Sequence, residues 1–133
     1  MGAASNNGSN SKGGFVKVAP EVQTVNFEYL HEVADEPALR KELISVYLND
    51  SEVLYSDLKA AIEKQECSKI ASLAHKWWGS SAACGIEALL PTLRQIEEMG
   101  LENSPAKAEA LVSQVREILD RVNVCLNEYA GRE

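Results

Sequence analysis

Helical spacing of apolar residues runs from about Val25 to Tyr129, and this feature limits the fold more than any other. Apolar side chains recur three or four positions apart, whereas no window alternates with the period-two pattern of a strand over more than a few residues. One-faced helices joined by short turns bury their apolar faces by packing antiparallel. The sequence therefore predicts an all-α protein, an antiparallel up-and-down four-helix bundle with a short extra N-terminal helix.

Capping residues indicate where the first helices begin. Asn26 is expected to cap a short helix that ends at Val33, and Pro37 suits the first turn of a long second helix that ends near Lys64. No glycine or proline separates that helix from the third. We place the boundary between the two helices within residues 65–68, because the apolar residues move to a different side of the helix there.

Glycine and proline place the remaining boundaries. The third helix is expected to reach Cys84, with Gly85 as a left-handed terminator. The fourth is predicted from about Glu87 to Met99, with Gly100 ending it. The pair Ser104–Pro105 then gives a cap and a first-turn residue for the last helix.

The amino-terminal residues have a different composition from the rest. Residues 1–14 are almost entirely Gly, Ser, Asn and Ala, which have little to bury on folding. We expect residues 1–24 to be a mostly disordered linker or tag, and residues 25–133 to form the bundle domain. A chain of 133 residues holds one such domain without a separate nucleotide-binding module.

Composition argues against several classes of function. With 13 Lys and Arg against 20 Asp and Glu, the net charge of −7 disfavours binding to nucleic acid or anionic membranes. No apolar run is long enough to span a bilayer, and the first twenty residues lack the apolar core of a secretory signal, so we expect the protein in the cytoplasm. We also expect a monomer. The three cysteines form no CxxC pair, and the acidic pairs Asp35–Glu36 and Glu97–Glu98 suit helix starts and solvated faces. No metal and no cofactor is predicted.

The third helix carries the chemical signal. His75 lies about 100° from the apolar stripe of this helix, so its side chain is expected to be at least partly exposed. Between Lys69 and Glu87 the only charged residue is Lys76, although a solvated face normally carries charge. A small-residue and apolar surface around a histidine is typical of a protein docking site. The predicted docking residues are Ala71, Ser72, Trp78, Ala82 and Ile86.

Gly79 strengthens the interpretation of His75. A glycine inside a helix costs about 1 kcal/mol relative to alanine, and at four residues after His75 it lies beside the imidazole. Its missing side chain leaves space for a phosphoryl group on the ring and for an approaching partner. Lys76 is expected to supply positive charge there. Trp77 is interpreted as a core residue, Trp78 as either packing or docking, and His31 as a surface or capping residue.

One segment of the sequence resembles the signature of the histidine-containing phosphotransfer (HPt) family. It runs from Ala74 to Gly85, with the sequence AHKWWGSSAACG, and is followed by Leu89. That signature is roughly A-H-x-L-K-G-S-S-A-x-x-G with a leucine four residues later. The resemblance implies a helical bundle in which His75 is phosphorylated, with Gly79 in a supporting role. Two positions depart from it: Trp77 replaces an aliphatic residue, and Trp78 replaces a lysine that in the family helps to steer the phosphoryl group. Lys76 is the nearest substitute in sequence.

The resemblance implies a phosphorelay intermediate without kinase activity. His75 would take a phosphoryl group from a receiver-domain aspartate and pass it to another receiver, with response regulators and a hybrid sensor histidine kinase as partners. A histidine-kinase dimerisation helix normally has an acidic residue and then a proline after its histidine, whereas Lys76 and Ser80 occupy those places here. An adaptor that docks receiver or kinase domains without being phosphorylated remains the alternative, and Trp78 is its best support. The sequence is compatible with a freestanding protein or a module of a hybrid kinase, and with either direction of phosphate flow.

Overall fold

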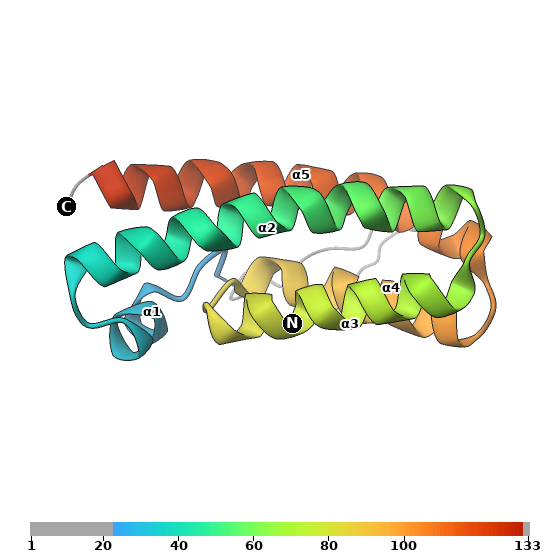
Figure 1. Cartoon of the computed structure of the whole chain (residues 1–133), viewed down its shortest axis with the longest axis horizontal. Helices are drawn as coiled ribbons and strands as arrows, with labels where there is room; N and C mark the ends of the chain where they lie inside the picture. Colours follow the sequence, from blue (N-terminus) through green and yellow to red (C-terminus); the bar gives the residue numbers. More distant parts are fainter. Residues whose placement is uncertain (1–22, 132–133) are drawn as a thin grey trace, which may run out of the picture.

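The computed structural model describes residues 23–131, and its helices confirm the predicted all-α bundle (Figure 1). No strand occurs within that range. The predicted linker or tag lies almost entirely outside it, as do residues 132 and 133. The helical elements are α1 (Phe27–Val33), α2 (Pro37–Glu63), α3 (Cys67–Ala83), the 3₁₀ turn η1 (Glu87–Leu89), α4 (Leu90–Leu101) and α5 (Pro105–Gly131).

The four longer helices form a closed ring around one core. Helix α3 packs between α2 and α4, and α5 completes the ring by packing against both of them. Figure 1 shows α2, α3 and α5 running along the long axis of the molecule, with α1 at the end where α2 begins. Each helix therefore has two neighbours and one remaining face toward solvent.

The turns at the two ends of α3 differ in kind. Gly85 adopts φ +74°, the left-handed conformation predicted for it. At the α2–α3 turn the left-handed residue is Gln65, with φ 58°, and the Glu66 N–H donates to the Ala61 carbonyl at 2.9 Å. A non-glycine residue thus makes the break, which is why no glycine marks it in the sequence.

The predicted role of Gly100 as the end of the fourth helix is wrong. Gly100 lies inside α4, which continues to Leu101, and the left-handed residue after the helix is Asn103 with φ 58°. A Cβ on Gly100 would lie 2.7 Å from the Ala71 nitrogen and 2.8 Å from the Cys67 carbonyl oxygen. The glycine is therefore explained by close contact between two helix backbones. The start of this helix also differs, because Glu87–Leu89 forms the separate 3₁₀ turn.

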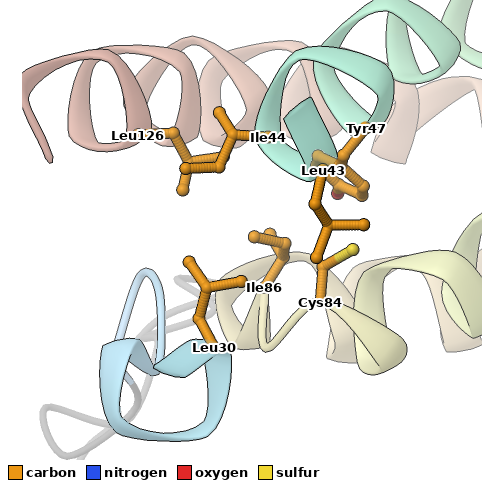
Figure 2. A pocket seen from close by; sticks show the side chains of 7 residues that line it. All are labelled: Leu30, Leu43, Ile44, Tyr47, Cys84, Ile86 and Leu126. Carbon is orange, nitrogen blue, oxygen red and sulfur yellow. The ribbon is translucent and has the colours of Figure 1, made fainter. Parts of the chain in front are cut away.

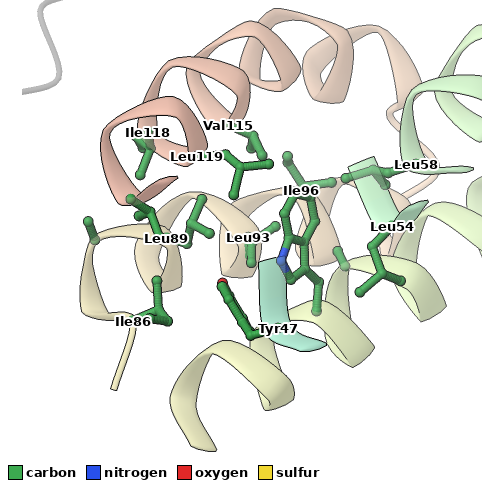
Figure 3. Packing of buried hydrophobic residues seen from close by; sticks show 14 of the residues in the cluster. Tyr47, Leu54, Leu58, Ile86, Leu89, Leu93, Ile96, Val115, Ile118 and Leu119 are labelled. Atoms are coloured by element: carbon green, nitrogen blue, oxygen red, sulfur yellow. The ribbon is translucent and has the colours of Figure 1, made fainter. Parts of the chain in front are cut away.

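The core contains two polar pairs that join α2 to α3. The fully buried Trp77 donates its indole N–H to the Ser51 hydroxyl at 3.1 Å, and the hydroxyls of Tyr47 and Ser81 are 2.7 Å apart. Burial raises the pKa of Tyr47, so the hydroxyl stays protonated. Figure 3 shows Tyr47 among the aliphatic side chains of the core. Each pair satisfies buried polar groups and fixes the alignment of α2 against α3.

At the α1 end of the bundle, seven side chains converge on a small space (Figure 2). They are Leu30, Leu43, Ile44, Tyr47, Cys84, Ile86 and Leu126, and they leave no room for a water molecule. Burial raises the pKa of the Cys84 thiol. This region is closed packing beneath α1 and offers no ligand cavity.

Within residues 23–131, no helix is long and apolar enough to cross a membrane, and no group of three or more acidic, cysteine or histidine side chains could hold a metal ion.

Candidate functional site

His75 is exposed on one side and held on the other. Its side chain is 68% accessible, and its Nδ1 lies 3.0 Å from an oxygen of Glu97 on α4. An ionised carboxylate only accepts hydrogen bonds, so Nδ1 carries the proton in this contact. The lone pair is then on Nε2, the ring nitrogen that does not face Glu97. In the neutral ring, Nε2 is therefore the nucleophilic nitrogen that is available to an incoming group.

Glu97 is the site residue that the sequence analysis missed, because it interpreted Glu97 and Glu98 together as a solvated pair. The two differ by about 100° around α4, and only Glu97 faces α3, where its side chain is 17% exposed. Finding it required the alignment of α3 against α4. One weak signal was present: an acidic residue at the edge of an otherwise apolar helix face.

Gly79 provides open space next to the ring. No heavy atom lies within 4 Å of the position that a Cβ would occupy. Because Gly79 follows His75 by one helical turn, this empty surface lies beside the imidazole. The geometry agrees with the space expected there, and a phosphoryl group could occupy it.

Two cationic side chains, Arg94 and Lys76, lie on different sides of α3. Trp78 is partly buried against α4, where the Arg94 guanidinium carbon lies 4.4 Å from the centre of its ring. Lys76 instead lines a groove of about 260 Å³ between α2 and α3, together with Asp50 and Asp57. The α4 side of His75 therefore has an arginine that the sequence analysis did not consider.

Two of the five predicted docking residues are buried, and their assignment to a docking face is wrong. Ala71 is only 7% exposed because α4 packs directly against it. Ile86 is 1% exposed, since the helix ends at Ala83 and the left-handed Gly85 turns the chain into the core. Ser72 is exposed, and Trp78 and Ala82 are partly exposed. The exposed surface of α3 also includes Ala83, which the prediction omitted.

The second histidine belongs to a different contact. His31 is exposed on α1, and its Nε2 is hydrogen-bonded to the Tyr129 hydroxyl of α5. Tyr129 also stacks on Phe27, with ring centres 4.5 Å apart. This aromatic cluster attaches α1 to α5, so His31 is a surface residue with a structural contact.

A bundle that presents one exposed, carboxylate-paired histidine on a helix surface fits a class of phosphotransfer modules. The Hpt domain family model matches residues 42–124, more than half of the sequence, and the chain belongs to this family. Hpt proteins are phosphotransfer intermediates rather than kinases. The family therefore gives a general role in phosphorelay signalling.

The fold is similar to the crystal structure of histidine-containing phosphotransfer protein B (HptB) from Pseudomonas aeruginosa PAO1. The two share 22% sequence identity with a TM-score of 0.77, over 87% of this chain and 99% of that one. At this identity the likeness supports the fold alone. No curated protein sequence gave a significant match.

Proposed function

We propose that the chain is a phosphorelay intermediate in which His75 accepts a phosphoryl group from a receiver-domain aspartate and passes it to another receiver. The observation that carries this proposal is the pairing of an exposed imidazole with Glu97 through Nδ1. Membership of the Hpt family supports it. Response regulators and a hybrid sensor histidine kinase are the proposed partners, and a monomer in the cytoplasm is the proposed state.

The transfer step follows from the ring nitrogens. The Nε2 lone pair attacks phosphorus of the aspartyl phosphate, and the N–P bond forms as the P–O bond to the acyl oxygen breaks. The aspartate carboxylate leaves with the bonding electrons. The imidazole keeps its Nδ1 proton and becomes positively charged, and transfer to the second receiver reverses these steps.

Glu97 assists by facing the charge that develops. A carboxylate 3.0 Å from Nδ1 stabilises the positive ring and fixes its orientation. Gly79 leaves room for the phosphoryl group and for the receiver. The sequence has no glycine-rich phosphate loop, so the phosphate must come from a partner and we propose no kinase activity for the chain itself.

Transfer of radiolabelled phosphate from a phosphorylated receiver domain to this chain tests the proposal directly. The wild-type chain should acquire acid-labile label, and His75→Gln should acquire none. Because the side chain is mostly exposed, the stability of this variant should change by less than about 0.5 kcal/mol. His31→Gln is the matched control and should be labelled normally. Label on the His75→Gln protein would identify another acceptor, and an unlabelled wild-type chain that still bound the receiver would establish the adaptor alternative.

A further inference from the structure

We infer that Arg94 binds the phosphoryl oxygens during transfer, and that Trp78 holds its guanidinium in place for that purpose. This inference rests on the proposed phosphorylation of His75. It assigns to α4 a phosphate-binding cation that the helix signature alone does not contain.

The position of Arg94 follows from the antiparallel pairing of α3 and α4. His75 contacts Glu97, and Trp78, three residues further along α3, contacts Arg94, three residues back along α4. Both contacts therefore lie along one side of α3, about one helical turn apart. The arginine side chain on the Trp78 ring therefore lies on the same side of His75 as Glu97, about one turn further along α3.

The contacts of Arg94 leave its donors available. The guanidinium lies over the ring, and within residues 23–131 it forms no hydrogen bond or ion pair. Stacking uses the face of the guanidinium, whereas its five N–H groups point outward in the plane. A planar fork of donors matches the oxygens of a phosphoryl group. Stacking also limits the conformations of the side chain, which lowers the entropy lost on binding.

The charge balance around His75 makes such a cation useful. A phosphoryl dianion would enter a site that already holds the Glu97 carboxylate, in a chain of net charge −7. Lys76 faces the opposite groove, whose lining includes Asp50 and Asp57. Both carboxylates line the groove that Lys76 faces, on the other side of α3 from Glu97 and Arg94. Arg94 is therefore the better placed of the two cations.

Phosphoramidate is a suitable probe because it needs no partner protein. Its P–N bond breaks as the N–P bond to Nε2 forms, and the protonated nitrogen leaves as ammonia with the bonding electrons. Arg94→Gln should slow labelling about tenfold, because a charge-assisted contact to the transferring group is lost. Lys107→Gln, which removes an exposed cation at the start of α5, is the matched control and should remain within about twofold of wild type. The double variant Trp78→Lys/Arg94→Gln places an ammonium one turn from His75 and should recover most of the rate.

Helicity and melting temperature recorded for each variant separate a structural role from a binding role. A purely structural role would lower the melting temperature of Arg94→Gln without slowing its labelling while it is folded, and that result would overturn the inference. The inference would also be overturned if Trp78→Lys/Arg94→Gln labelled as slowly as Arg94→Gln, because the slow rate would then not come from the loss of a positive charge. If the wild-type chain took no label from either phosphoramidate or a phosphoreceiver, the proposed function itself would be wrong.

Discussion

At the scale of single residues, the two histidines show how partners determine the chemistry of the same side chain. Both are exposed, but His31 bonds to a phenol within an aromatic cluster, whereas His75 bonds to a carboxylate beside an empty surface. A carboxylate stabilises the positive ring that forms on phosphorylation, and a phenol does so much less. The surroundings, more than exposure, distinguish the proposed acceptor.

Glu97→Ala should therefore slow phosphoryl uptake about tenfold, because the ring loses both its orientation and the charge that stabilises its product. Glu97→Gln retains an oxygen acceptor for the Nδ1 proton and should lose less activity. Initial rates of label transfer from a phosphoreceiver measure the effect. The neighbouring Glu98→Ala, on the exposed side of α4, is the control and should transfer normally. Equal rates for Glu97→Ala and wild type would show that the contact with His75 is incidental.

At the scale of helices, the close approach of α4 to α3 positions the site. Gly100 allows the two backbones to meet near Ala71, and Glu97 lies one turn earlier on α4. The distance between Glu97 and His75 is thus set by a glycine that touches neither of them. Packing at one end of the helix pair is coupled to the geometry of the proposed site.

We expect Gly100→Ala to destabilise the protein by about 1–3 kcal/mol, since the new methyl group would meet backbone atoms of α3 that cannot move independently. Thermal or urea unfolding measures this loss, and the folded protein should also transfer phosphate more slowly. Gly79→Ala makes the same substitution on α3 in open space, and should raise stability by up to about 1 kcal/mol. A Gly100→Ala protein as stable as wild type would mean that α4 shifts without cost.

The difference between local and helix–helix effects explains which features the sequence could predict. Helix starts at Asn26 and Pro37 and the left-handed Gly85 are local effects, and the structure confirms all three. The break predicted within residues 65–68 agrees with the turn at Gln65, whereas the end of the fourth helix was misplaced at Gly100 because the left-handed residue there is Asn103. The contacts of His75 with Glu97 and of Trp78 with Arg94 depend on how two helices align, and no local pattern encodes that alignment. His75 was therefore predictable, and its partners on α4 were not.

At the scale of the whole molecule, the proposed receiver partner must cover more than α3. A stable protein interface buries about 800 Å² on each partner, so a domain centred on His75 must also contact α2 or α4. The α2 side offers Val53, which is 59% exposed and lines the same groove as Leu73 and Lys76. The net charge of −7 gives no attraction toward the acidic pocket of a receiver. Apolar contact is then expected to supply most of the affinity.

Val53→Ser should consequently weaken receiver binding about fivefold, because a docked partner would no longer bury an isopropyl group there. Val124→Ser is a matched control: Val124 is 58% exposed on α5 and lines a shallow groove to which α3 contributes nothing. It should leave affinity unchanged, and both variants should melt within a few degrees of wild type because neither side chain is buried. Titration calorimetry at low and high salt completes the test, since apolar docking predicts a dissociation constant that changes little with ionic strength. A steep loss of affinity in salt, or equal effects of the two substitutions, would place the receiver on a charged surface away from the α2–α3 groove.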